Sequence, residues 1–453
     1  MRIETAIPIS LAFVKEAIGI KADPTDRKRF ASAICTDSRE IYGGEIFIGL
    51  RGEKYDGSVF INKIKNSALC SIGSLGSDAD ITLADTVSSL LRIAYAYKKL
   101  LPIKKTIAIT GSVGKTTTKN LTAKLMSFKY RVHSTYKNLN NEIGVPFTIL
   151  SAPADTEMLI LEAGMNHIGE LERISLSAEP DISVITKIGT AHVGNLGSRE
   201  KIADAKLEIL SGMKRKFALI PYGEELLSKK IECFKTISTC DNDATYKLLR
   251  TAEEEFVFKS HGSEFKIKAS GIKSAGFHVS ECLAFALASY SELGASVTEL
   301  TDAIGNIDFN SLSNRVVVNG LQIINDSYNS SPEAAEEALK AILLEKGKKS
   351  ALIGDMLELG DFSRELHFKI GLTASQCGLD KLYLLGAFAK DVYNGAVCGG
   401  FDKNRIFVNE DAESPEITAE QIRDHSSSDV ILFKASRKIK LERIINILKK
   451  AEK

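Results

Sequence analysis

The fold is decided by the segment Lys105-Thr-Ile-Ala-Ile-Thr-Gly-Ser-Val-Gly-Lys-Thr-Thr-Thr118. Its first six residues have the apolar pattern of a buried strand, and the helix-forming stretch Lys119 to Met126 follows directly. Glycines between a strand and a helix let the backbone turn tightly, so that amide groups point inward and the helix N-terminus adds partial positive charge. This is the setting of a phosphate-binding loop. The spacing is GxxGKT, a variant of GxxxxGKT, and a glycine turn that merely starts a helix rarely shows it.

The loop predicts that the chain binds ATP together with Mg²⁺. Lys115 is expected to hold the β and γ phosphates, and the hydroxyl of Thr116 is expected to coordinate the metal. The candidate ATP-binding residues of the loop are Gly111, Ser112, Val113, Gly114, Lys115, Thr116 and Thr117.

Around this loop the sequence predicts an α/β fold with three domains, since 453 residues is about three times a domain length of ~150. Residues 1–103 form a small α/β unit with a strand at 45–50 and a closing helix at 88–101. Residues 104–313 place strands at 158–161, 182–186 and 217–221 between helices, which predicts a mostly parallel central sheet of the P-loop ATPase kind. Residues 314–453 predict a doubly wound α/β domain. Its strands are expected at 321–324, 351–353, 382–385, 406–408 and 430–433, and its helices at 334–344 and 441–450.

The composition argues against binding to nucleic acid and against insertion into a membrane. The chain has 59 Lys and Arg against 58 Asp and Glu. Its net charge is therefore too small to attract nucleic acid or anionic lipid electrostatically. The seven Cys residues include no CxxC pair, so a reduced, cytoplasmic chain is expected. No apolar run approaches the ~18 residues that span a bilayer, and we therefore predict no membrane insertion. We expect a monomer that recognises small-molecule partners locally.

Further motifs lie along nearly the whole chain. They are Thr36-Asp-Ser-Arg39, Asn140-Asn-Glu-Ile-Gly-Val-Pro146, Glu162-Ala-Gly-Met-Asn166, Ala191-His192, Ala205-Lys-Leu-Glu208, Asn325-Asp-Ser-Tyr-Asn329 and Gly354-Asp-Met-Leu-Glu-Leu-Gly360. In this order they resemble the Mur ligase family, and the segment 354–360 resembles the branch that adds a dipeptide. The resemblance implies that residues 1–103 bind a UDP-sugar-peptide, 104–313 bind ATP, and 314–453 receive the dipeptide.

The reaction that the resemblance implies joins D-alanyl-D-alanine to UDP-N-acetylmuramoyl-tripeptide through an acyl phosphate, forming a precursor of peptidoglycan. ATP is needed because a carboxylate is a poor electrophile and amide formation in water is uphill. The third residue of the tripeptide, whether diaminopimelate, lysine or ornithine, stays open.

The resemblance also assigns roles to individual residues. Glu162, at the end of the strand 158–161, matches a Mg²⁺ ligand, which its chemistry supports. His192 and Lys206 match ligands of a second Mg²⁺, with Lys206 carbamylated by CO₂, although a lone histidine and a helical lysine are more often structural or solvated. Together with Lys115 they are the candidate catalytic residues. The remaining ATP-side candidates are Glu281, Arg315, Asp326 and Asn329. The substrate-side candidates are Ser38, Arg39, Asn140, Asn141, Asn166, Lys434, Ser436 and Arg437.

Three positions depart from the family pattern. Ser58 stands where histidine is usual, Glu281 stands in place of an asparagine on the adenine side, and Ala435 replaces glycine. A carboxylate accepts a hydrogen bond from the adenine amino group but donates none, so the preference among purine nucleotides stays open.

Competing interpretations are another Mur-type amino-acid ligase, a folylpolyglutamate synthase, a P-loop switch that hydrolyses nucleotide without joining substrates, and an inactive scaffold. The segment 354–360 argues against the first two. The joint presence of Lys115, Thr116, Glu162, His192 and Lys206 argues against a scaffold.

Overall fold

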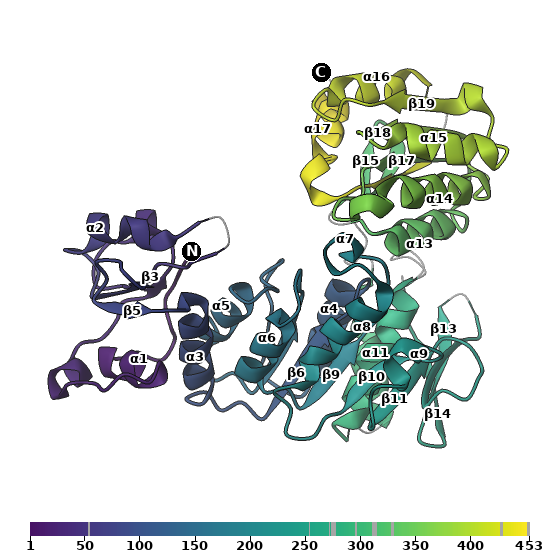
Figure 1. The fold of residues 1–453 in the computed structure, drawn as a ribbon. Coiled ribbons are helices and arrows are strands. Elements are labelled where there is room, and N and C mark those ends of the chain that lie inside the picture. Colours follow the sequence, from purple (N-terminus) through teal and green to yellow (C-terminus); the bar gives the residue numbers. More distant parts are fainter. Residues whose placement is uncertain are drawn as a thin grey trace.

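Three sheets follow one another along the chain (Figure 1). The computed structural model describes residues 1–52, 55–252, 254–270, 272, 278–294, 297–309, 315–327, 330–425 and 429–450. The N-terminal sheet lies at one end, the central sheet continues from it, and the C-terminal sheet stands at an angle above the far half of the central one. The predicted α/β class is confirmed.

The N-terminal sheet has five strands in the order β1-β2-β3-β4-β5, of which only β1 runs antiparallel to its neighbour. Its strands are β1 Arg2–Ile3, β2 Ile34–Cys35, β3 Ile46–Ile48, β4 Cys70–Ser74 and β5 Ile81–Leu83, and its helices are α1 Leu11–Ala17 and α2 Ile61–Ile64. The core strand β3 is fully buried, as the run 45–50 predicts.

The central sheet has nine strands in the order β14-β13-β12-β11-β10-β9-β6-β8-β7. They are β6 Lys105–Thr110, β7 Val132–Ser134, β8 Met158–Glu162, β9 Ile182–Ile185, β10 Ala218–Pro221, β11 Phe234–Ser238, β12 Tyr246–Arg250, β13 Glu255–Ser260 and β14 Ser263–Lys268. The predicted parallel sheet is confirmed from β7 to β12, but β12, β13 and β14 pair antiparallel. These last strands carry many Lys and Glu on their exposed face and have no long apolar run.

The helices of this region cover both faces of the central sheet. They are α3 Thr86–Lys98, α4 Lys115–Met126, α5 Gly144–Leu150, α6 Glu170–Ala178, α7 Val193–Leu196, α8 Arg199–Leu207, α9 Glu225–Ser228, α11 His278–Glu292 and α12 Val297–Gly305. Alternate residues of β6 point to opposite faces, so Ile107 and Ile109 pack with α4 and α11 while Ala108 packs in the other core. Helix α3, predicted to close the first domain, packs on α5 and α6 (Figure 1).

Strand β6 is the point where the order of the central sheet reverses. It pairs with β8 on one side and with β9 on the other, all parallel. In an open parallel sheet, ligands bind outside the carboxyl ends of the strands at such a switch point. The glycine loop that follows β6 therefore lies where the topology predicts a ligand site.

The C-terminal sheet has the strand order β15-β16-β20-β17-β18-β19, and only β15 is antiparallel. Its strands are β15 Arg315–Val318, β16 Leu321–Asp326, β17 Lys349–Gly354, β18 Lys381–Leu385, β19 Ile406–Asn409 and β20 Val430–Lys434. Its helices are α13 Pro332–Ile342, α14 Ser363–Ser375, α15 Ala389–Cys398, α16 Pro415–His425 and α17 Glu442–Lys450. The predicted doubly wound arrangement is confirmed, since α13, α14 and α15 belong to one core and α16 and α17 to the other.

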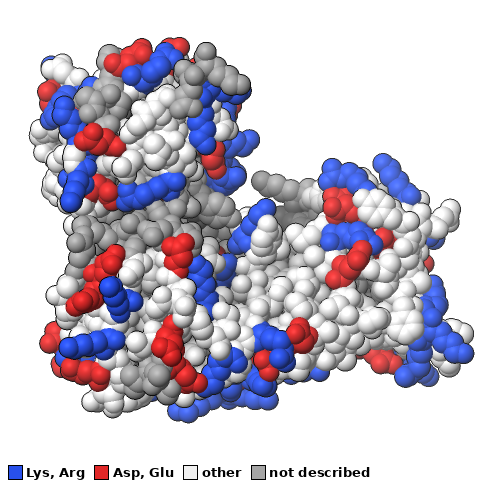
Figure 2. Space-filling view, turned by 180° about the vertical axis from the view of Figure 1, so that it is seen from behind, with Lys and Arg blue, Asp and Glu red and all other residues white. Residues whose placement is uncertain are grey.

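Viewed from behind, the molecule has an open angle between the C-terminal lobe and the N-terminal end (Figure 2). Lys and Arg mingle with Asp and Glu on this face, in keeping with the balanced charge of the sequence. In the part of the chain that is described, every helix is too short or too polar to cross a membrane.

Candidate active site

The glycine loop after β6 is held against the end of β9. Gly111 has a φ of +143°, and a Cβ added there would overlap the Thr186 hydroxyl and lie 3.0 Å from the Thr186 amide nitrogen. Thr186 Oγ1 donates to the Val113 carbonyl at 2.5 Å, and the Ser112 amide donates to the Lys187 carbonyl at 2.8 Å. The position therefore requires glycine, and the loop conformation depends on the β9 end.

Lys115 begins α4 and folds back over the loop. Its amine donates to the Gly111 carbonyl at 2.8 Å and lies 3.4 Å from the Ser112 carbonyl. Burial lowers the pKa of Lys115, and the nearby Glu162 carboxylate opposes that effect. The Lys115 amine thus lies among the loop carbonyls, next to the place where the phosphates of ATP are expected.

Thr116 and Glu162, two of the four predicted magnesium ligands, meet in the structure. Thr116 Oγ1 donates to Glu162 Oε2 at 2.9 Å, and Asn140 Nδ2 donates to Glu162 Oε1 at 2.9 Å. The backbone amide of Glu162 donates to Thr135 Oγ1 at 2.9 Å. Parallel pairing of β6 with β8 places Glu162 beside Ile109, which explains why it reaches the loop.

This pair of oxygen donors fits Mg²⁺, which prefers one or two protein oxygens and completes its shell with phosphate and water. Among the described residues, no three His, Cys, Asp or Glu side chains gather as a ready metal cluster. The chain therefore offers part of a coordination shell at Thr116 and Glu162.

Lys206 lies on α8 and is buried, with 1% of its surface exposed. Burial lowers its pKa well below the ordinary value, and the neighbouring Lys115 ammonium lowers it further. A solvated helical lysine would show neither property. The structure thus brings Lys206 near the phosphate loop.

His192 lies between β9 and α7 with a φ of +66° and faces the C-terminal domain. Its Nδ1 is 2.8 Å from Oε2 of Glu358, and this contact lowers the pKa of Glu358. The Gly194 amide donates to the Glu358 carbonyl at 3.3 Å. The segment 354–360 therefore packs against the His192 loop. The second Mg²⁺ site predicted from His192 and Lys206 stays a prediction.

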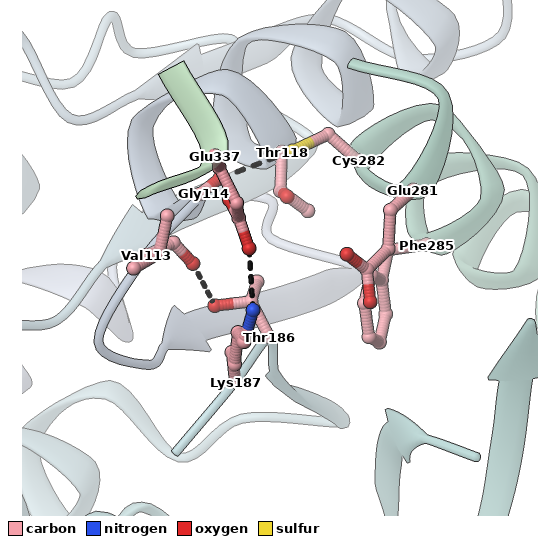
Figure 3. Close-up of a pocket in the computed structure, with 9 residues that line it drawn as sticks. All are labelled: Val113, Gly114, Thr118, Thr186, Lys187, Glu281, Cys282, Phe285 and Glu337. Carbon is pink, nitrogen blue, oxygen red and sulfur yellow. Dashed lines mark hydrogen bonds and ion pairs between the residues drawn. The ribbon is translucent and has the colours of Figure 1, made fainter. Parts of the chain in front are cut away.

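A pocket lies beside the phosphate loop, lined in part by Val113 and Gly114 (Figure 3). Helix α11 contributes Glu281, Cys282 and Phe285, and Lys187 and Glu337 form an ion pair across it. Burial raises the pKa of Glu281, Glu337 raises it further, and Lys187 opposes them. The sequence-predicted residue Glu281 is thus in the same pocket as the phosphate loop.

Comparisons with known proteins agree with this geometry. A family model described as the Mur ligase middle domain matches residues 109–285, and one described as Mur ligase, glutamate ligase domain matches residues 313–437. A Bacillus subtilis (strain 168) protein named UDP-N-acetylmuramoyl-tripeptide--D-alanyl-D-alanine ligase is 34% identical over 451 residues, which cover 95% of this chain and 96% of that protein. The chain belongs to the Mur ligase family.

Two solved structures resemble this Mur ligase closely. MurF from Acinetobacter baumannii matches with a TM-score of 0.83 and 25% identity, covering 98% of this chain and 100% of that one. MurF ligase from Thermotoga maritima in complex with ADP matches with a TM-score of 0.79 and 27% identity, covering 92% and 97%. The predicted Mur ligase architecture is confirmed.

The predicted ATP-side residues of the C-terminal domain make contacts within that domain. Arg315 forms a bidentate ion pair with Glu345, at 2.5 Å and 3.2 Å. Asp326 Oδ2 is 2.8 Å from the amine of Lys434, because parallel pairing of β16 with β20 puts the two residues side by side. Asn329 lies outside the described residues. Contact of these residues with ATP stays a prediction.

The substrate-side candidates of the central domain have local partners as well. Asn140 holds Glu162, and Asn141 Oδ1 accepts from the Gly144 amide at 2.8 Å at the start of α5. The Asn166 side chain is exposed, and its backbone amide donates to Glu170 at 2.7 Å. Asn140 therefore holds the Glu162 carboxylate of this Mur ligase, a contact that the sequence did not predict.

The remaining substrate-side candidates belong to the N-terminal and C-terminal domains. Ser38 and Arg39 are in a short 3₁₀ turn, where the largely exposed Arg39 makes a bidentate ion pair with Asp37 at 2.6 Å and 2.9 Å. Ser436 Oγ accepts from the Leu357 amide at 2.9 Å. Arg437 pairs with Glu442 on α17. Ser436 thus ties the segment after β20 to the segment 354–360.

Two of the departures from the family pattern have structural roles. Ser58 is buried; its Oγ accepts from the Ser74 amide at 2.8 Å and donates to the Gly49 carbonyl at 3.4 Å. Ala435 is buried, and a Cβ added at Gly354 would lie 2.8 Å from the Ala435 methyl group. Small residues fit both positions because the backbones approach closely.

Sequence reasoning missed several residues of the site. Thr186 and Lys187 follow β9 at the same sheet edge as the loop, so their position after a parallel strand was an available signal. Glu333 and Glu337 on α13 read as an ordinary solvated helix face, and only the packing of the domains brings them to the site.

Proposed function

We propose that this chain is an ATP-dependent ligase that joins D-alanyl-D-alanine to UDP-N-acetylmuramoyl-tripeptide and so forms the pentapeptide precursor of peptidoglycan. The observation that carries the proposal is the match, over nearly its full length, to the Bacillus subtilis ligase of that name. The phosphate loop with Thr116 and Glu162 supplies the nucleotide chemistry that such a reaction needs.

In the first step, a carboxylate oxygen of the tripeptide attacks the γ-phosphorus of ATP, the bond to the bridging oxygen breaks, and ADP leaves. The loop amides and Lys115 hold the phosphates as charge moves onto the leaving group. Thr116 and Glu162 would hold Mg²⁺, which neutralises phosphate charge when bound. The product of this step is an acyl phosphate.

In the second step, the amine of D-alanyl-D-alanine attacks the acyl carbon, phosphate leaves, and the nitrogen loses a proton. We assign Lys434, Ser436 and Arg437 to the dipeptide side, and Ser38, Arg39, Asn140, Asn141 and Asn166 to the UDP-sugar-peptide side. We also assign the boundaries at 103/104 and 313/314 to the three domains and place the enzyme in the cytoplasm. Glu281, Arg315, Asp326 and Asn329 are assigned to ATP.

We infer further that Lys206 is carbamylated. CO₂ adds to a neutral amine to give a carbamate with loss of one proton, and the burial of Lys206 beside Lys115 favours the neutral amine. The resulting anion would join His192 in holding a second Mg²⁺. Protein equilibrated with ¹³C-bicarbonate should give a carbamate carbon signal that Lys206→Ala abolishes. Lys206→Ala should lose most activity and regain part of it with short carboxylic acids; full activity in this variant would contradict the assignment.

Product analysis tests the proposed function. ADP release should require both the uridine-linked tripeptide and D-alanyl-D-alanine, and mass spectrometry should show the joined product. ADP release that is indifferent to both substrates would favour a nucleotide switch instead. A panel of tripeptides ending in diaminopimelate, lysine or ornithine identifies the third residue.

A further inference from the structure

The pocket beside the phosphate loop has walls from two domains (Figure 3). Val113 and Gly114 of the loop and residues of α11 form one side, and Glu337 on α13 of the C-terminal domain forms another. Lys187 is the one cation among the described residues that line this pocket. Its amine forms an ion pair with Glu337, and Glu281 lines the same pocket.

The backbone of Lys187 is tied to the phosphate loop. Its carbonyl accepts from the Ser112 amide at 2.8 Å, and the preceding Thr186 hydroxyl donates to the Val113 carbonyl at 2.5 Å. The end of its side chain is held from the other domain by the Glu337 carboxylate. Burial by itself would lower the pKa of Lys187, but the contact with Glu337 and the nearby carboxylates raises it. The lysine is therefore a fixed positive charge.

Helix α13 holds the same central-domain loop at a second point. Oε1 of Glu333 accepts from the Thr190 amide at 2.6 Å, and a Cβ added at Gly189 would lie 2.7 Å from the Glu333 carboxylate. Glu333 and Glu337 are four residues apart, so both project from one face of the helix. Residues 187–190 thus lie between the phosphate loop and α13, in contact with each.

We propose that Glu337 is a positioning residue for nucleotide use: through its ion pair it holds Lys187 in the pocket beside the phosphate loop, so that ATP binding depends on contact between the C-terminal and central domains. Lys187 gives the pocket a positive charge beside the phosphate loop, which attracts a nucleotide polyanion, and the ion pair with Glu337 fixes where that charge lies. The proposal rests on the proposed ATP-dependent function and adds the residues that couple ATP binding to domain contact.

A double-mutant cycle on the full-length enzyme tests the pair, with the KM for ATP as its readout. Lys187→Gln should raise this KM about tenfold and Glu337→Gln about threefold. The double variant should be no worse than Lys187→Gln, because the second change removes a partner whose effect is already lost. At saturating ATP, kcat should stay within about twofold of the wild type, since the pair acts on binding. Affinity for a fluorescent ADP analogue should shift in the same ratios.

A charge swap and a matched control complete the test. Lys187→Glu combined with Glu337→Lys should recover at least about threefold of the KM lost in Lys187→Glu alone. Glu225→Gln breaks the exposed Lys229–Glu225 pair of 2.5 Å on α9 and should leave the KM for ATP unchanged. Fold changes that multiply in the double variant, or a wild-type KM in Glu337→Gln, would overturn the proposal. A wild-type chain without substrate-dependent ADP release would instead contradict the proposed function.

Discussion

Replacing Gly111 by alanine should disrupt the conformation in which the loop binds phosphate and so lower kcat/KM for ATP. The position has a φ of +143°, which costs an L-residue about 2 kcal/mol. The new methyl group would overlap Thr186 Oγ1, so that hydroxyl must give up its 2.5 Å hydrogen bond to the Val113 carbonyl, a loss of about 1 kcal/mol. The enzyme recovers this free energy by letting the loop leave its phosphate-binding conformation. A penalty of about 3 kcal/mol corresponds to a loss of roughly 100-fold in kcat/KM for ATP.

The assay compares kcat/KM for ATP in Gly111→Ala with two further variants. Gly43→Ala is the matched control, because Gly43 has a φ of +137° but a Cβ there would meet nothing within 4 Å. It should change ATP use by less than about threefold. Adding Thr186→Ala to Gly111→Ala removes the overlapping hydroxyl and should recover part of the activity. The reasoning is refuted if Gly111→Ala stays within about threefold of the wild type, or if Gly43→Ala loses ATP use to the same extent.

Three further changes test other parts of the structure. Glu162→Gln removes the negative charge beside Thr116, so steady-state assays should show kcat reduced about 100-fold and a higher Mg²⁺ requirement; an unchanged Mg²⁺ dependence would contradict the assignment. His367 accepts from the Met356 amide at 2.9 Å, and burial lowers its pKa from 6.5. Since the unfolded chain then binds the proton more readily, stability should fall as the pH drops below about 6.5, and denaturant titrations of His367→Gln should lack this dependence. Asn141→Ala removes the amide acceptor at the start of α5 and should lower the unfolding free energy by about 1 kcal/mol in urea titrations, with Asn166→Ala, an exposed side chain, as the unchanged comparison.

The local parts of the fold and the site were predictable from the sequence. The strand, glycine turn and helix of the phosphate loop are contiguous, so their pattern alone places Lys115 and Thr116. Glu162 was predictable because it ends a buried strand, and the parallel pairing with β6 brings it to the loop. Strand β13 was missed although its sequence carries a strand signal, since its burial alternates and Phe256 and Phe258 face the core.

Contacts between distant residues were not predictable. The side-chain amide of Asn140 donates to Glu162, because the backbone before α5 passes the end of β8, and its assignment to the sugar nucleotide stays a prediction. Asp326 and Lys434 were assigned to different ligands, yet they form an ion pair of 2.8 Å, since β16 and β20 become neighbours only when the last strand inserts into the sheet.

The sequence by itself determined that this chain carries a phosphate loop, belongs to a ligase family and alternates strands with helices. These properties depend on short-range patterns, in which backbone conformation and side-chain chemistry are set by neighbouring residues. Only the tertiary structure decided which charges meet. Lys187 and Glu337 belong to different domains, and strand order together with domain contact brings them into one pocket. The phosphate loop is therefore encoded locally, whereas the pocket around it depends on how the domains pack.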